Sequence, residues 1–324
     1  MIDLSNVAAR LLADEPALLT SLDFGPFVRQ GTGSGPSLLI GDVSEINLMR
    51  PGRTSRLDHR MAHLAHAGDV VLVRERDPVF EGYLQEFCTL KDIEFFGTDP
   101  TCDDGVAKQA LTSAPLFDHL VDVTRKNGGL TIQPYLTTET IWHLAKAIGE
   151  RANCIVNVSG PSSRISLRAN DKLWFVQLAR TVIGNDAVPP TISAYGPMAS
   201  AALIQWFSTQ GKQVIVKVPD SAGSAGNIRL DPEILENLST DEIEALLIER
   251  LHGTGWADTY PILVGVWDSN VSCTPSVQMW IPHISEGQPT VQGVFEQRVF
   301  GPTAAFVGAI KSRQPATLQH ALAD

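Results

Sequence analysis

Short apolar runs alternate with amphipathic segments through the first half of the chain. The runs are about five residues long, which is typical of strands buried in a sheet. The intervening segments repeat their apolar residues at helical spacing, and Gly68 and Gly149 are predicted to end two of these helices. The pattern predicts an α/β domain with a mostly parallel sheet over residues 1–160. The predicted strands are Ser37–Gly41, Asp69–Val73 and Cys154–Val158, and the predicted helices are 55–67, 79–87 and 138–148.

A second domain, residues 161–324, is predicted to follow the loop at Ser159–Ser163. Asn170 is expected to cap its first helix, and Ser239 with Glu242 forms the capping box of a later one. The last strands are expected to pair as a hairpin, and no element is expected after them. The predicted helices are 170–184, 197–210 and 239–253, and the predicted strands are Val214–Val218, Pro261–Trp267, Val277–Ile281, Thr290–Val299 and Ala304–Ile310.

The composition is that of an ordinary globular protein, with 44% hydrophobic and 19% charged residues among 324. A formal net charge of −11 argues against a nucleic-acid partner, which needs a basic surface. The four cysteines lie far apart without a Cys-x-x-Cys motif, as expected for reduced thiols. Neither a signal peptide nor an apolar run long enough to span a bilayer is visible. These features predict a cytoplasmic protein without a membrane partner.

The segment Val214–Asn227 combines a strand, a lysine and a loop of small residues. The valines alternate with Ile215 and Lys217, so Lys217 is predicted to face away from them. The residues that follow, Ser221–Asn227, are here called the flap loop; up to Gly226 they are all Ser, Ala or Gly. Backbone N–H groups of such a loop can surround a polyphosphate, and a nearby lysine adds a positive charge. The alternative is a flexible hairpin tip with a solvated lysine.

Other candidate sites are less specific. The segment Gly31–Gly35 precedes a predicted strand instead of following one, so a plain loop is favoured over a dinucleotide-binding turn. Three histidines at helical spacing can bind a metal, but a solvated helix face is the simpler interpretation. Four arginines nearby can bind a carboxylate or phosphate, or form a basic surface patch. The histidines are His59, His63 and His66, and the arginines are Arg50, Arg53, Arg56 and Arg60.

The order of motifs in the second domain resembles the ATP-grasp superfamily. That order is a lysine at a helix start, a strand with a second lysine, a flap, an apolar hinge strand and a hairpin. The front half is similar to the pre-ATP-grasp domain of peptide ligases of the pheganomycin type. The carrying segments are Asp171-Lys172, Val214–Lys217, Ser221–Asn227, Leu263–Trp267 and the 277–299 hairpin, with His59–Leu64, Ala67–Val73, Gln133–Thr138, Gln292–Gln297 and Phe306–Ala309 for the pheganomycin branch.

The resemblance implies an ATP-dependent carboxylate–amine ligase of natural product biosynthesis. Such an enzyme forms a peptide or related amide bond through an acyl phosphate, with ATP and Mg²⁺. Its substrates would be small carboxylates and amines, such as amino acids or peptides. The implied organisation is a pre-ATP-grasp domain, then a small flap lobe at about 212–262 and an incomplete C-terminal lobe at 263–324.

The resemblance also assigns roles to individual residues. Lys172 and Lys217 would neutralise the phosphates, and the flap loop would close over them. The backbone of Val264 and Val266 would pair with adenine, and Asp268 would contact the ribose. The flap residues implied are Ser221, Gly223, Ser224, Ala225, Gly226 and Asn227.

Two departures from the family pattern are visible. Gly265 stands where the hinge usually carries a glutamate. The acidic strands that hold magnesium are not found, and Glu296 is a weak candidate ligand because one carboxylate is a poor site for two ions. The alternatives are a piece of a longer protein, a second polypeptide that completes the lobe, or a pseudoenzyme that binds nucleotide or a partner. A Rossmann-like metabolic enzyme is a more distant alternative.

Large apolar side chains are frequent on the last strands. An apolar face of that size usually marks an interface, so a homo-oligomer or a complex with a second chain is expected. The alternative is that helices of the first domain cover these side chains. They are Trp267, Met279, Trp280, Phe295, Phe300 and Phe306.

Overall fold

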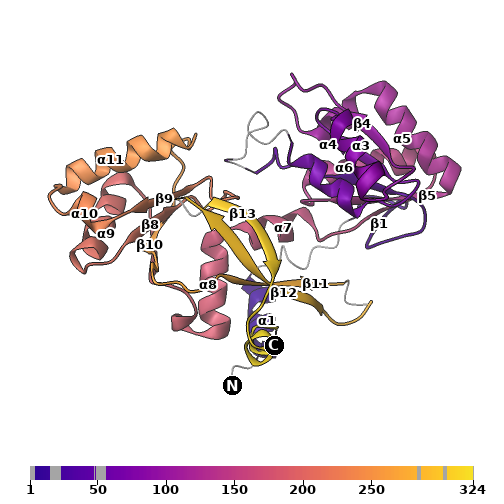
Figure 1. Ribbon diagram of the computed structural model, residues 1–324. Helices are drawn as coiled ribbons and strands as arrows, with labels where there is room; N and C mark the ends of the chain where they lie inside the picture. The colour runs from indigo at the N-terminus through magenta and orange to yellow at the C-terminus, as the bar shows by residue number, and fades with distance from the viewer. Residues whose placement is uncertain are drawn as a thin grey trace. The chain divides into compact units, whose positions relative to one another are not determined.

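The computed structural model describes residues 4–14, 23–46, 48, 56–282, 286–301 and 305–323. The chain divides into two compact units (Figure 1). One is Ala8–Asn170, and the other combines Met1–Val7 with Asp171–Asp324. Helix α1 (Leu4–Asp14) spans the division. Among the described helices, none has the length and apolar character needed to cross a bilayer.

The first unit is built on a six-stranded sheet in which every strand runs parallel to its neighbours. The strand order is β1-β6-β5-β2-β3-β4. This confirms the predicted α/β fold with a parallel sheet. The strands are β1 (Val28–Gln30), β2 (Ser37–Ile40), β3 (Val70–Val73), β4 (Glu94–Gly97), β5 (Gly129–Pro134) and β6 (Ile155–Val158).

Helices cover both faces of this sheet because alternate residues of each strand point to opposite sides. Leu38 and Ile40 of β2 belong to one buried cluster, with side chains of α4, α5 and α6. Leu39 belongs to a second cluster, with side chains of η2 and α3. The helices are η2 (Asp58–Leu64), α3 (Pro78–Phe87), α4 (Val106–Thr112), α5 (Ala114–Asn127), α6 (Glu139–Ala152) and α7 (Ser163–Asn170).

The carboxyl ends of β2 and β5 meet where the strand order reverses. From β2 the chain passes to β3 and β4 on one side, and β5 and β6 lie on the other. The N–H of Tyr135, just after β5, donates to the carbonyl of Ile40 at 2.8 Å. A Cβ atom on Gly41 would lie 2.2 Å from the carbonyl oxygen of Asp58, so only glycine allows η2 to approach the end of β2 this closely.

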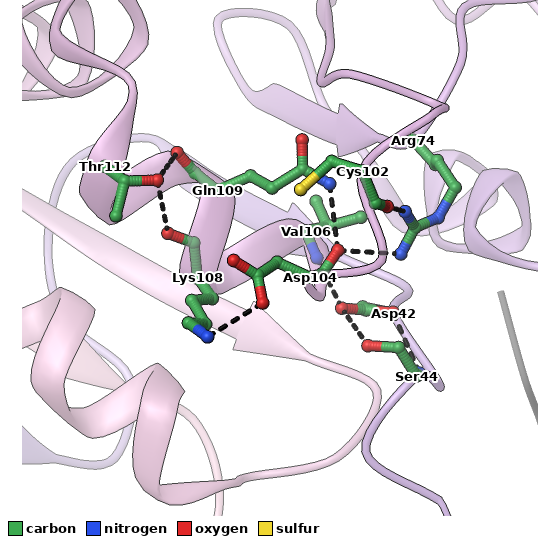
Figure 2. A network of polar contacts seen from close by, with 9 residues as sticks. All are labelled: Asp42, Ser44, Arg74, Cys102, Asp104, Val106, Lys108, Gln109 and Thr112. Atoms are coloured by element: carbon green, nitrogen blue, oxygen red, sulfur yellow. Dashed lines mark hydrogen bonds and ion pairs between the residues drawn. The ribbon is translucent and has the colours of Figure 1, made fainter.

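A polar network fixes the loops at the same end of the sheet (Figure 2). Asp42 accepts from the N–H of Val106 at 2.6 Å, which anchors the start of α4, and from the Ser44 hydroxyl at 2.8 Å. The Arg74 guanidinium donates to the carbonyls of Cys102 at 2.7 Å and Asp104 at 3.1 Å. These contacts hold the loops after β2 and β4 in place.

The second unit contains two antiparallel sheets. The first has the order β7-β10-β8-β9, and helix α9 packs on it with α11 against α9. Helix α11 begins with the predicted capping box of Ser239 and Glu242. The elements are α8 (Lys172–Ile183), η3 (Asn185–Ala187), β7 (Thr191–Ala194), α9 (Pro197–Thr209), β8 (Val214–Lys217), β9 (Asn227–Leu230), α10 (Pro232–Leu235), α11 (Thr240–Gly253) and β10 (Ile262–Val266).

The second sheet has the order β11-β12-β13, and α12 packs against β12. Strands β11 and β12 are antiparallel, which confirms the predicted hairpin. The antiparallel sheets after the parallel domain complete the predicted fold class. The elements are β11 (Pro275–Trp280), β12 (Thr290–Phe300), β13 (Ala305–Lys311) and α12 (Ala316–Ala323).

Several predicted boundaries were wrong. The 55–67 helix is a shorter 3-10 segment, η2, and Gly149 lies inside α6, which continues to Ala152. Asp171 caps α8, whereas Asn170 ends α7, because it is the Asp171 carboxylate that accepts from the first turn of α8. Helix α12 was not expected. All four cysteines are free, as predicted.

The approach of η2 to Gly41 predicts a stability effect. Gly41→Ala should lower the free energy of unfolding by about 1–3 kcal/mol, because the new methyl group overlaps backbone atoms. Gly82→Ala is the matched control, since Gly82 lies in α3 with open space around it, and should raise stability by roughly 0.5–1 kcal/mol. Urea unfolding of both variants checks this. Equal stability of the two variants would show that η2 does not depend on Gly41.

Candidate functional site

Lys217 lies at the end of β8, opposite Asn227 at the start of β9. Val214, Ile215, Val216 and Val218 are all buried, whereas Lys217 is partly exposed. Burial therefore does not alternate along β8, although strand geometry puts Lys217 and the valines on opposite faces. Within the described residues, no side chain or carbonyl accepts a hydrogen bond from its ammonium. Burial lowers the pKa of Lys217 below its usual range. A half-buried ammonium without a counter-charge favours an anionic ligand.

The flap loop joins β8 to β9 and is closed by a hydrogen bond from the Val218 N–H to the Gly226 carbonyl, 2.9 Å long. Gly223 and Ser224 both have left-handed backbones, with φ of 59° and 65°. Within the described part of the chain, the N–H groups of Gly223, Ser224 and Gly226 donate to no acceptor. The consecutive N–H groups of Gly223 and Ser224 are therefore available to a ligand, and the phosphate-binding role of the flap loop stays a prediction.

Lys172 is held by the residues where the chain enters the flap loop, Val218–Ser221, here called the flap root. Its ammonium donates to the carbonyls of Val218 at 3.2 Å and Pro219 at 3.0 Å, to the hydroxyl of Ser221 at 3.0 Å and to the Ser221 carbonyl. An ammonium has three N–H donors, so these four acceptors occupy all of them. The structure therefore places Lys172 as a positioning residue for the flap loop.

Burial is the main cause of a lowered Lys172 pKa, which falls to about 8. The charge of Asp220 raises this pKa, the charge of Lys217 lowers it and the charge of Asp171 raises it. Sequence reasoning missed the role of Asp220. Its position in the Pro219–Ser221 turn directly after the Lys217 strand was the available signal.

The predicted hinge lies in β10, between β7 and β8. Val264 is therefore paired on both sides, and the N–H of Val266 already donates to the Pro190 carbonyl at 2.9 Å. Asp268 is exposed just beyond the strand. A Cβ atom on Gly265 would lie 2.8 Å from both the Pro190 carbonyl oxygen and the Thr191 hydroxyl oxygen, so the packing here favours glycine over any residue with a side chain.

Glu296 lies on β12, in the other sheet of this unit. Its carboxylate accepts from the N–H of Arg313 at 3.0 Å and the hydroxyl of Ser312 at 3.1 Å. The hydrogen bond from the Arg313 backbone is the largest cause that lowers its pKa. Among the described residues, no three His, Cys, Asp or Glu side chains cluster as a metal site requires. These residues therefore do not fit a magnesium centre.

Residues 58–150, which lie within the first unit, match the family model described as the Pre ATP-grasp domain. The match falls in the front half of the chain, where the sequence resemblance implied a pre-ATP-grasp domain. No curated protein matches the chain in sequence.

Solved structures of similar architecture are distant in sequence. N5-carboxyaminoimidazole synthetase from Staphylococcus aureus, complexed with ADP, is 14% identical, with a TM-score of 0.44 over 92% of this chain and 63% of that one. The biotin carboxylase domain of Hydrogenobacter thermophilus 2-oxoglutarate carboxylase, with MgADP, ADP and bicarbonate, is 13% identical, with a TM-score of 0.49 over 90% and 57%. D-alanyl-alanine synthetase A from Vibrio cholerae is 13% identical, with a TM-score of 0.38 over 59% and 54%. The chain thus spans less than two thirds of each.

The Lys172 contacts predict how the flap loop moves. Lys172→Met should make the hydrogen-bonded amides of the flap loop, those of Ala225 and Asn227, exchange with deuterium roughly tenfold to a hundredfold faster, because hydrogen bonds to a charged group contribute about 1.5–3 kcal/mol each. Lys217→Met is the matched control and should leave flap exchange unchanged, since Lys217 has no acceptor there. Hydrogen exchange with mass spectrometry measures both, and an unchanged rate in Lys172→Met would contradict the positioning role.

Proposed function

We propose that this protein binds MgATP and is an ATP-dependent carboxylate–amine ligase. The observation that carries the proposal is the unpaired, half-buried ammonium of Lys217 beside a loop with free backbone N–H groups. A cation and N–H groups that converge on one place suit a polyphosphate. The pre-ATP-grasp domain that precedes this unit supports the same reading.

The proposed reaction transfers the γ-phosphoryl group of ATP to a carboxylate. An amine then attacks the acyl phosphate, and an amide, ADP and phosphate result. Lys217 would stabilise the charge on the phosphates, and the N–H groups of the flap loop would stabilise the charge on the transferred group. Lys172 would hold the flap loop in place, so that it excludes water from the acyl phosphate.

The remaining assignments complete this proposal. Adenine would lie against the backbone of the hinge strand at Val264 and Val266. Asp268 would bind the ribose. The described residues supply no magnesium centre, so no step is assigned to magnesium bound by this chain. The proposal has three further parts, which rest on the sequence resemblance and composition. The substrates would be amino acids or peptides, the biological role would be natural product biosynthesis, and the location would be the cytoplasm.

A second candidate is a nucleotide-binding or partner-binding pseudoenzyme. It is favoured by the absence of any acidic cluster among the described residues, which therefore supply no set of magnesium ligands. Such a protein would keep the Lys217 site and lose turnover.

Binding and turnover measurements separate the two candidates. By calorimetry, Lys217→Met should weaken ATP binding by roughly tenfold to a hundredfold, the effect of losing a charged hydrogen bond of about 1.5–3 kcal/mol. Lys172→Met should weaken it less, because it acts through the flap loop. Lys212→Met is the matched control. Lys212 is exposed just before β8, so its loss should leave the ATP affinity unchanged.

Release of ADP from ATP in an amino-acid mixture, with and without magnesium, then tests the reaction. ADP release that depends on amino acids supports the ligase. ATP binding without turnover supports the pseudoenzyme. No ATP binding at all would contradict both the ligase and the nucleotide-binding pseudoenzyme.

The β11-β12-β13 sheet leaves large apolar side chains exposed, with Phe300 at 77% and Phe306 at 53%. Met279 and Trp280 are exposed as well. We propose that a second copy or another chain covers them. Light scattering should show an assembly larger than the monomer that Phe300→Asp dissociates, and a monomeric parent protein would contradict this.

A further inference from the structure

An arginine in the first unit has a buried pair of donors without a partner. Arg60 lies in η2, and its Nε and one terminal nitrogen, Nη2, are buried and bond to nothing in the described structure. Buried polar groups almost always have a partner, because leaving them unsatisfied costs free energy. The residue as a whole is partly exposed, so this pair lies just beneath the surface.

Another arginine of the same domain shows what such a pair binds. Arg76 donates its Nε and Nη2 to the two carboxylate oxygens of Glu81, at 3.0 and 2.5 Å. These are the same two atoms that are free in Arg60, and they form a side-on fork that matches a carboxylate.

The Arg60 fork is held in a fixed orientation. The guanidinium carbon lies 3.4 Å from the centre of the Tyr135 ring, a cation–π contact. Tyr135 is tied to the end of β2 through the Ile40 carbonyl, and η2 is held against Gly41. An arginine oriented in advance loses less entropy when it binds a ligand.

The fork lies at the part of the sheet where ligands bind in open α/β folds. Arg60 follows β2 and Tyr135 follows β5, so their contact crosses the point where the strand order reverses. A small pocket at the same edge is lined by Asp42, Glu45 and Thr138, among others, but not by Arg60 or Tyr135. Three other arginines at this edge have partners: Arg56 pairs with Asp77, Arg74 with two carbonyls and Arg76 with Glu81.

We propose that Arg60, stacked on Tyr135, binds the carboxylate group of a small organic acid. The fork would donate two parallel hydrogen bonds to the two oxygens, as Arg76 does to Glu81. The further statement that this acid is a substrate of the ligase rests on the proposed function. Carboxylate binding itself does not, because Lys217 and the flap loop belong to the other unit.

Acetate and its neutral analogue acetamide test the site in the full chain without nucleotide. The Nε–H signals of the arginines are followed by nitrogen-15 NMR at constant ionic strength, and Arg60→Lys identifies the Arg60 signal by its loss. Acetate should shift this signal saturably, and acetamide should not. The Nε–H of Arg76 is the internal control and should stay in place, because Glu81 already occupies it.

Three outcomes would overturn the proposal: no saturable shift with acetate, an equal shift with acetamide, or saturation by inorganic phosphate but not by acetate. Tyr135→Leu should weaken acetate binding by roughly threefold to thirtyfold through loss of the stacking contact. Calorimetric ATP binding is measured on the same samples. Acetate binding without ATP binding would remove the proposed function and leave this site standing, and the reverse result would remove only the site.

Discussion

The hydrogen bonds from the Lys172 ammonium to the flap root are the interaction on which the second unit depends. It ties the first turn of α8 to the turn after β8, two parts of the chain 46 to 49 residues apart in sequence. A partly buried ammonium must find acceptors to replace water, and backbone carbonyls supply them here. This contact fixes the root of the flap loop and leaves its tip, with the left-handed Gly223 and Ser224, free to meet a ligand.

The two units share one electrostatic feature. Lys217 in the second unit is partly buried and the Arg60 fork in the first is buried, and neither cation has a partner for these donors in the described chain. Burial of a cation without a partner costs free energy. An anionic ligand would supply the missing counter-charge. The guanidinium suits a planar carboxylate, whereas the compact ammonium beside N–H groups suits phosphate.

Two departures from the family pattern have different physical origins. Gly265 lies where β10 closely approaches the Pro190 carbonyl, and a Cβ atom at this position would overlap its oxygen. Glu296 accepts from Ser312 and Arg313 through one carboxylate oxygen, Oε1, just after β13. Local packing therefore constrains the first position, and local hydrogen bonds constrain the second.

By itself the sequence determined the elements whose signals are local. Alternation predicted β8, the apolar runs predicted β2, β3 and β10, and Ser239 with Glu242 predicted the start of α11. The sequence also set Lys217 apart from the apolar residues of its strand, and Lys217 is the residue of β8 that is only partly buried. Local signals failed at Gly149, where α6 continues because packing against its neighbours outweighs the low helix propensity of glycine.

Only the tertiary structure decided what the cations contact. The partners of Lys172 are mainly backbone carbonyls, which every residue carries and which therefore leave no mark in the sequence. The free fork of Arg60 likewise depends on which strands are neighbours, since its contact with Tyr135 joins the segments after β2 and β5. Side-chain type set the chemistry that each residue can perform, and the packing of distant segments decided which groups remained available for a ligand.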